Sequence, residues 1–179
     1  MSVGGWERSI ALIWPRCPRC GKDFVRRTYL EGVVDHFVSL ASLYPFRCQV
    51  CTHRFRAFRF GLGKLAQVPD RRQYERITTG FPVFLEGQSN RQETAVDLSM
   101  GGCTLKVQTP FSEGTFMQLL LQTSDREPPI RVDTAIVRSV RSRTIGLQFL
   151  EFPTGEKDRL SQFIYSRLVD YRTAPEASY

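Results

Sequence analysis

The sequence lacks any apolar run long enough to cross a bilayer, which takes about 20 consecutive apolar residues. The apolar segment Ile10–Trp14 is also too short for the core of a secretory signal, and no small-residue cleavage site follows it. These absences argue against an integral membrane protein and against a secreted one. We therefore expect a cytoplasmic protein without a transmembrane segment.

The residues and motifs on which catalysis depends are also scarce. The only histidines are His36 and His53, and neither lies near a serine or cysteine nucleophile signature. The zinc-protease pattern HExxH and the phosphate-loop pattern GxxxxGK(S/T) are both absent, and no pair of carboxylates stands out. The sequence therefore predicts a binding protein and not an enzyme.

What the sequence does have is a globular composition with an uneven basic charge. Hydrophobic residues make up 41% of the chain and charged residues 24%, which excludes wholesale disorder. Residues 1–60 hold ten Lys and Arg against four Asp and Glu, which gives +6 of the total net charge of +7. One interpretation is an anionic partner such as a nucleic acid; the other is a basic coat that keeps a small domain soluble.

Four of the five cysteines form two close pairs, Cys17/Cys20 and Cys48/Cys51, whereas Cys103 stands alone. In a reducing compartment, paired CxxC motifs are typical of metal ligands and not of disulfides. Two such loops supply four thiolates in a tetrahedron, which suits Zn²⁺ and leaves no open coordination position. We expect a structural zinc site. The alternatives are a redox pair or four ordinary cysteines.

Residues 15–58 resemble the zinc-ribbon family through CPRCG at one end and FRCQVCTHRF at the other. The resemblance implies metal-stabilised hairpins in a scaffold that often binds nucleic acid or protein. Apolar residues at spacings of three and four over Tyr29–Tyr44 predict a helical insertion that ends at Pro45 and departs from the ribbon pattern. We expect its apolar stripe to pack on the ribbon or on the domain that follows; the alternatives are a dimer contact or a helix on a membrane surface.

The hydrophobic pattern changes after a connector at residues 61–70, so we divide the chain into a domain at 1–60, a domain at 71–172 and a tail at 173–179. In the second domain the pattern is period-two, with turn residues between short segments. This predicts a mainly β chain whose strands form a small antiparallel barrel or sandwich, followed by a C-terminal helix from about Gly155 to Tyr171. The six expected strands are Ile77–Leu85, Glu93–Leu98, Cys103–Val107, Thr115–Thr123, Ile130–Val140 and Thr144–Leu150.

Three arginines, Arg71, Arg72 and Arg76, lie just before the first of these strands. A guanidinium group binds phosphate oxygens or the O6 and N7 edge of guanine, and it also stacks on a base. Such a cluster indicates a small anion that carries guanines. The alternative is a solvated linker whose arginines form salt bridges with Asp70 and Glu75.

A second polar group follows about twenty residues later, at the end of an expected strand. Asp97 can accept hydrogen bonds from a guanine or hold an arginine, and Ser99 offers a hydroxyl for a phosphate or for a backbone cap. Gly101 and Gly102 allow a tight turn and a close approach of the backbone to a ligand. The alternative is a capped turn without a ligand.

Together these residues resemble the signature of the PilZ family. The RxxxR motif is Arg72-Gln-Tyr-Glu-Arg76, the (D/N)xSxxG motif is Asp97-Leu-Ser-Met-Gly-Gly102, and the similarity extends over about residues 68–170. It implies a six-stranded barrel that binds cyclic di-GMP, with the arginine segment closing over the ligand. By this resemblance the ligand-binding residues are Arg72, Arg76, Asp97, Ser99 and Gly102. Arg71 is added because an arginine there accompanies an intercalated ligand dimer in the family.

The resulting hypothesis is a bacterial cyclic di-GMP effector in which ligand binding changes the arrangement of two domains and signals to a protein partner. One alternative is a nucleic-acid-binding zinc ribbon with the barrel as a scaffold, which would depend on Arg54, Arg56 and Arg59. The other is a PilZ-like protein-interaction module that binds no nucleotide.

Overall fold

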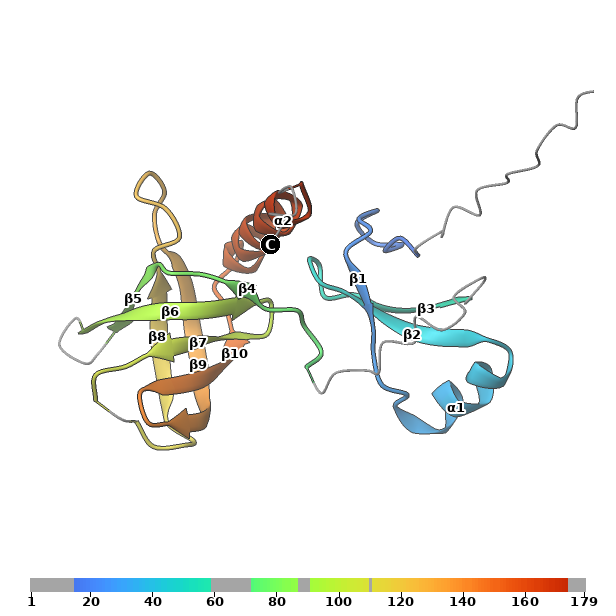
Figure 1. Cartoon of the computed structure of the whole chain (residues 1–179), viewed down its shortest axis with the longest axis horizontal. Coiled ribbons are helices and arrows are strands. Elements are labelled where there is room, and N and C mark those ends of the chain that lie inside the picture. Colours follow the sequence, from blue (N-terminus) through green and yellow to red (C-terminus); the bar gives the residue numbers. More distant parts are fainter. Residues whose placement is uncertain (1–14, 59–71, 87–90, 110, 174–179) are drawn as a thin grey trace, which may run out of the picture.

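The computed structural model describes residues 15–58, 72–86, 91–109 and 111–173. Residues 15–58 form a three-stranded sheet with a short helix, and the later residues form a barrel with a long helix (Figure 1). The expected connector at 61–70 and most of the expected tail lie outside the described residues. Within the described ranges, no helix is both long and apolar enough to cross a membrane.

The N-terminal sheet has the strand order β1-β2-β3, and both pairings are antiparallel. Its strands are β1 (Val25–Arg27), β2 (Leu43–Cys48) and β3 (Arg54–Phe58), and helix α1 (Gly32–Leu40) connects β1 to β2. Because β2 is central and ends at a cysteine, the sheet carries its last residue directly into the second CxxC loop.

The helix expected over Tyr29–Tyr44 is shorter than predicted, and its end at Pro45 was wrong. Helix α1 ends at Leu40, a turn follows in which Ser42 has a positive φ of 60°, and Pro45 lies inside β2. Strand β2 pairs with a strand on each side, and these pairings outweigh the helical spacing of its apolar residues.

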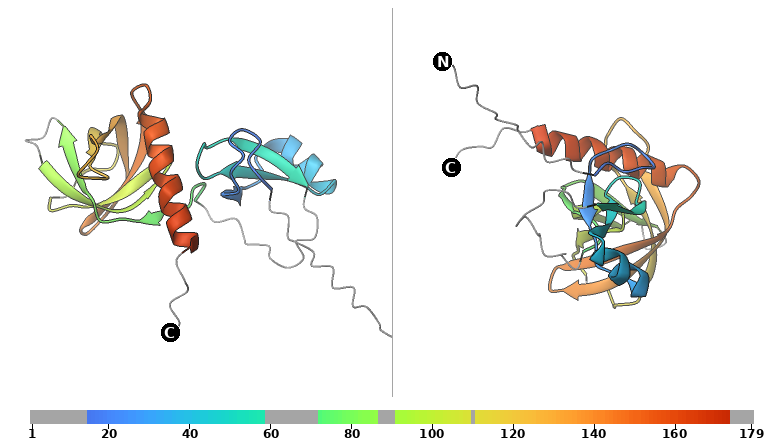
Figure 2. Two further views of the ribbon diagram at one scale, coloured as in Figure 1. Left: turned by 90° about the horizontal axis from the view of Figure 1, so that it is seen from above. Right: turned by 90° about the vertical axis from the view of Figure 1, so that its right-hand side faces the viewer.

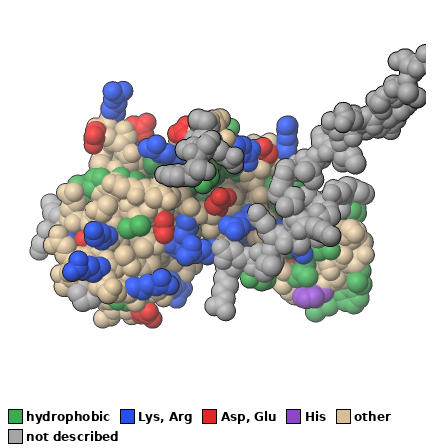
Figure 3. Space-filling view, in the orientation of Figure 1, with side chains coloured by type: hydrophobic (Ala, Val, Ile, Leu, Met, Phe, Trp, Pro, Cys, Tyr) green, Lys and Arg blue, Asp and Glu red, His purple; other side chains and the backbone are tan. Residues whose placement is uncertain are grey.

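The expectation that the apolar stripe of α1 is packed was also wrong. Val33, Val34, Phe37 and Leu40 are between 60% and 84% exposed. The one buried residue of α1 is Asp35. Apolar side chains therefore gather on the surface over α1, at the lower right of Figure 3.

Seven strands make up the second sheet, and six of them close into a barrel, as expected for the fold class. The ring runs β6-β5-β8-β9-β10-β7, and β7 pairs back to β6, with every pairing antiparallel. The strands are β4 (Ile77–Thr78), β5 (Pro82–Glu86), β6 (Arg91–Ser99), β7 (Gly102–Lys106), β8 (Phe116–Leu121), β9 (Ile130–Arg141) and β10 (Thr144–Glu151).

The strand expected over Ile77–Leu85 is divided into β4 and β5, which both pair with β6. Thr78 lies opposite Asp97 and Pro82 lies opposite Thr94, so this side of the pairing has one residue more than β6. An extra residue of this kind is a β-bulge, which bends a strand and increases its twist. Strand β4 follows the arginine segment directly, and its Thr78 lies opposite Asp97.

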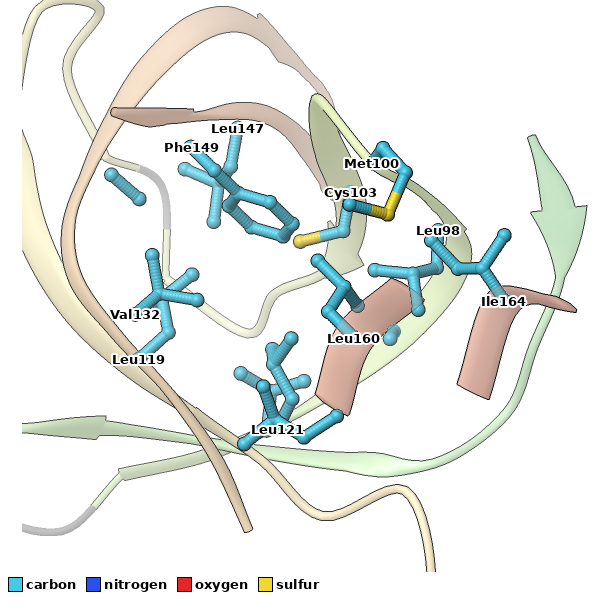
Figure 4. Close-up of a cluster of buried hydrophobic side chains, with 14 of the residues drawn as sticks. Leu98, Met100, Cys103, Leu119, Leu121, Val132, Leu147, Phe149, Leu160 and Ile164 are labelled. Atoms are coloured by element: carbon cyan, nitrogen blue, oxygen red, sulfur yellow. The ribbon is translucent and has the colours of Figure 1, made fainter. Parts of the chain in front are cut away.

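Helix α2 (Glu156–Thr173) matches the expected C-terminal helix and packs on the barrel (Figure 2). Leu160, Ile164 and Leu168 lie four residues apart on one face and are buried. Figure 4 shows the first two in the same core as Leu98 and Phe149. Each such side chain contributes about 1.5–3 kcal/mol by burial, so the helix is an integral part of this core.

Cys103 belongs to the barrel core, as its alternation in the sequence predicts. It is fully buried on β7, and Figure 4 shows it within the hydrophobic cluster. Burial raises the pKa of its thiol well above the ordinary 9.0, which keeps it protonated.

Candidate metal centre and ligand-binding face

Two CxxC loops bring the four expected cysteines together at the end of the N-terminal sheet. The sulfur atoms of Cys17, Cys20, Cys48 and Cys51 all lie within 4.8 Å of one another. The Cys17–Cys51 distance is 3.5 Å and the Cys20–Cys48 distance is 3.6 Å. Four thiolates about 2.3 Å from a tetrahedral zinc ion lie about 3.8 Å apart. The spacing therefore fits a zinc ion, and all four thiols are free of disulfides.

Backbone N–H groups support the thiolates, in the manner expected of a metal loop. The N–H groups of Val50 and Cys51 both donate to the sulfur of Cys48 at 3.4 Å. The backbone N–H of Gln49 donates to the carbonyl of Phe24 at 2.9 Å, which ties the second loop to the first half of the sheet. We call residues Cys48–Cys51 the metal loop.

The cysteines differ in their tendency to lose a proton. Burial raises the pKa of Cys48 and of Cys51 above the ordinary 9.0. Burial acts on Cys17 in the same direction, but the N–H groups of Cys20 and Arg19 outweigh it and lower the pKa of that thiol. A bound cation would deprotonate all four, so any affinity of this site for a metal would fall as the pH falls.

Arg76 and Asp97, which the sequence singles out separately, form an ion pair on the barrel surface. Nη1 of Arg76 donates to Oδ1 of Asp97 at 2.6 Å and to Oγ1 of Thr104 at 2.6 Å. The backbone N–H of Thr104 donates to the same carboxylate oxygen at 3.1 Å. Nε and Nη2 of Arg76 make no hydrogen bond within the described ranges, and a quarter of its side chain is exposed. The side chain of Arg76 is therefore held in place by Nη1, while Nε and Nη2 make no hydrogen bond to a described residue.

Ser99 and Gly102 stabilise the turn between β6 and β7. The hydroxyl of Ser99 is buried and donates to the carbonyl of Gly102 at 3.1 Å. A Cβ atom at Gly102 would lie 2.0 Å from the carbonyl oxygen of Leu147 on β10. Gly102 is therefore required where β7 closes the barrel, and Ser99 caps the turn.

Arg72 is exposed at the start of the segment Arg72–Arg76, which we call the arginine arm. Arg71 lies outside the described residues. The arm reaches the barrel at Arg76, and its Tyr74 ring lies against Gly101 in the β6–β7 turn, where a Cβ atom would be 2.7 Å from the ring. The structure thus brings Arg76, Asp97, Ser99 and Gly102 to one end of the barrel.

Sequence reasoning missed Thr104, Tyr74 and the buried Gln49. Thr104 could have been found, because a two-residue turn that pairs Ser99 with Gly102 places Asp97 opposite Thr104. The other two residues make contacts between distant segments, and no spacing in the sequence indicates them.

The last helix also contacts the N-terminal part of the chain. Arg172 forms an ion pair with Asp23 at 2.7 Å, and its guanidinium lies over the ring of Phe24. This pairing lowers the pKa of Asp23. The Phe24 ring in turn meets Tyr165 edge to face, with centroids 5.8 Å apart. These contacts join helix α2 to the N-terminal unit, in addition to the contacts that the arm makes.

The fold and the site define a class of protein: a closed six-stranded antiparallel barrel with a C-terminal helix, whose strands β6 and β7 hold an arginine from the preceding segment. The PilZ domain family matches residues 70–166, more than half of the sequence. The chain belongs to the PilZ domain family, which confirms the resemblance inferred from the two motifs. No curated protein matches the chain in sequence.

A solved structure with a TM-score of 0.50 supports the fold. The PilZ domain of YcgR from Escherichia coli, determined with c-di-GMP, is 18% identical, has a TM-score of 0.50 and covers 61% of this chain and 100% of that one. MotI/DgrA, an inhibitor of motility from Bacillus subtilis, is 19% identical with a TM-score of 0.49. The match covers 65% of this chain and 54% of that protein, so this chain corresponds to about half of its length.

Proposed function

We propose that this protein is a cyclic di-GMP receptor whose ligand binds at the arginine arm and the β6–β7 turn. The observation that carries the proposal is Arg76, which Asp97 and Thr104 hold at 2.6 Å while Nε and Nη2 make no hydrogen bond to any described residue. A cyclic dinucleotide offers two phosphates and two guanines, and both match the guanidinium fork. Membership of the PilZ family and the ligand of its YcgR relative support the choice of cyclic di-GMP.

The proposed roles differ between the residues. Arg72 and Arg76 bind the ligand directly, and Arg71 takes part when two ligand molecules bind. Asp97 orients Arg76 and accepts hydrogen bonds from a guanine. Ser99 and Gly102 act indirectly, because they shape and close the turn.

We also propose a zinc ion at the four cysteines, with a structural role. Four thiolates complete a tetrahedral site, so the ion would fix the fold of the N-terminal unit and would not react with a substrate. The chain would then have two modules, residues 1–60 and 71–172, with a connector at 61–70. Ligand binding would change their relative arrangement and signal to a protein partner.

The test is isothermal titration of cyclic di-GMP into zinc-loaded protein, with Arg76→Ala and Arg141→Ala compared. Arg141 is an exposed arginine at the far end of the barrel, where β9 turns into β10, and it serves as the matched control. We expect saturable binding in the wild type and in Arg141→Ala, and at least about tenfold weaker binding in Arg76→Ala, since a hydrogen bond to a charged group contributes about 1.5–3 kcal/mol.

A binding stoichiometry near two would support a role for Arg71. The absence of heat and of competition at high ligand concentration would overturn the proposal. Domain rearrangement is tested by distances between spin labels on Ala41 and Gln108, introduced by a chemistry that spares the native cysteines. Unchanged distances on ligand addition would show that binding leaves the arrangement as it is.

Nucleic-acid binding by the basic N-terminal unit has weaker support. Arg54 and Arg56, two of the three arginines on which it would depend, are paired with Asp35, and Arg59 lies outside the described residues. Binding that falls steeply with salt and is lost on neutralising these arginines would revive it.

A further inference from the structure

The metal loop touches the arginine arm through one buried amide. Gln49, the residue after Cys48, is only 4% exposed. Its Oε1 accepts the backbone N–H of Glu75 at 2.6 Å, and its Nε2 donates to the carbonyls of Arg47 at 3.0 Å and Gln73 at 3.5 Å. A single side chain therefore holds the backbone of the arm at two points, between Arg72 and Arg76.

Between these two points, Tyr74 lies between the N-terminal unit and the barrel. On one side, Nη1 of Arg47 donates to its hydroxyl at 3.3 Å, and the guanidinium lies 5.5 Å from its ring. On the other side, the ring rests against Gly101, where a Cβ atom would come within 2.7 Å of it. Neither Tyr74 nor Gly101 is a fixed position of the RxxxR or (D/N)xSxxG pattern, so the two motifs alone do not specify this contact.

The position of Gln49 depends on how the metal loop is folded. Its neighbour Cys48 is a proposed ligand and accepts two backbone N–H groups of the same loop. Four thiolates held by an ion would fix this turn, whereas loops of this kind lose their structure without the ion. The anchor of the arm is thus built on the part of the protein that a metal would order.

We propose that Gln49 is a positioning residue for the arginine arm, and that metal binding at the four cysteines therefore strengthens nucleotide binding at the barrel. The identity of the nucleotide rests on the proposed function above. A pre-positioned arm does not have to be ordered when the ligand arrives, which raises affinity without any new ligand contact. Linkage makes the effect reciprocal, so the nucleotide would also slow metal loss.

The test uses the full-length, zinc-loaded protein and compares Gln49→Ala with Gln118→Ala, an exposed glutamine on β8. In the ligand-free protein, the Glu75 amide should exchange with solvent at least about tenfold faster in Gln49→Ala, because its acceptor is gone. Cyclic di-GMP should bind about fivefold more weakly, which corresponds to the loss of one ordinary hydrogen bond. Zinc content should equal that of the wild type, and Gln118→Ala should change none of these quantities.

A second variant, on the barrel, tests the contact that holds Tyr74 in the arm. Gly101→Ala should displace Tyr74 and weaken nucleotide binding to a similar extent, whereas Gly80→Ala, where an added Cβ meets nothing within 4 Å, should not. Chelation of the metal should weaken binding in the wild type about as much as Gln49→Ala does, and should add little in Gln49→Ala.

The outcomes separate the two proposals. Wild-type exchange at Glu75 together with wild-type affinity in Gln49→Ala would overturn the positioning role. Faster exchange at Glu75 with unchanged affinity would overturn the coupling to the ligand. If the wild type binds no cyclic di-GMP, the proposed function fails, and amide exchange at Glu75 with and without metal still decides whether the metal loop orders the arm.

Discussion

Gly21 and Thr52 occupy the same position in the two CxxC loops, one residue after the second cysteine, and both have a left-handed backbone. Their φ angles are 71° and 63°. Glycine adopts this conformation freely, whereas a β-branched residue adopts it only at a cost. The second loop therefore holds its turn under strain that the first loop does not have.

Replacing Thr52 by glycine should relieve this strain. We expect the zinc-loaded Thr52→Gly protein to gain about 0.5–1 kcal/mol in the free energy of unfolding, after allowance for the greater entropy of the unfolded chain. Gly21→Ala should lose about 1 kcal/mol, because it introduces the same strain into the first loop. Chemical denaturation of both variants measures the difference, and a destabilised Thr52→Gly would show that the threonine side chain has a stabilising contact.

Asp35 should be essential to the N-terminal unit. It is fully buried, it accepts the N–H of Glu31 at 2.9 Å, and it is paired with Arg54 and Arg56, which together hold its pKa at about 2 against the ordinary 3.8. Asp35→Asn should cost about 2–3 kcal/mol, since it removes the buried carboxylate charge that Arg54 and Arg56 share. Because the pKa is lowered on folding, the stabilisation is complete above the ordinary value and is lost as the pH falls through about 2.

Denaturation at neutral pH compares Asp35→Asn with the wild type. The pH dependence is tested by measuring the pKa of Asp35 itself with carboxyl NMR, because acid would also release the proposed metal and so destabilise the fold by another route. A pKa near the ordinary value would contradict the ion-pair network.

Gly102 should tolerate no side chain, and for a reason separate from ligand binding. A Cβ there would lie 2.0 Å from the backbone oxygen of Leu147, so Gly102→Ala must separate β7 from β10 and should cost about 2–3 kcal/mol. Gly80→Ala, with open space around the added atom, should stay within about 0.5 kcal/mol of the wild type. Thermal unfolding without nucleotide measures both, and an unaffected Gly102→Ala would assign this glycine to the ligand alone.

Metal analysis should find one zinc ion per chain, bound by the cysteine pairs. Cys48→Ser should lose most of the metal, because the site then lacks one thiolate and the loop loses the sulfur that accepts two N–H groups. Cys103→Ala, in the barrel core, should keep the full amount. Zinc measured by mass spectrometry after extensive dialysis separates these outcomes, and retention in Cys48→Ser would exclude the four-cysteine site.

The sequence was sufficient to predict those features that leave a regular spacing or a short motif in it. The period-two segments predicted the barrel strands, and the doubled CxxC spacing predicted a cysteine cluster that the structure confirms. The two family motifs predicted a site, and the structure brings Arg76 and Asp97 into contact.

The predictions from sequence failed where contacts between distant segments determine the local structure. Leu43 and Tyr44 continue the helical spacing of α1, yet they pair with Phe58 and Ala57 in a hairpin, which the zinc-ribbon resemblance implies but the apolar spacing does not. The bulge between β4 and β5 is a matter of register against β6, which one strand alone cannot reveal. Gln49 reads as an ordinary polar residue until the fold places it under the arm.

The placement of the five cysteines divides the thiols four to one between the small N-terminal unit and the barrel core. Removal of the proposed metal would open four of them to a thiol reagent, while Cys103 should react only after the barrel itself unfolds. The number of thiols labelled over time would therefore record two separate events in one experiment. The order in which the cysteines are labelled would therefore show which of the two units opens first.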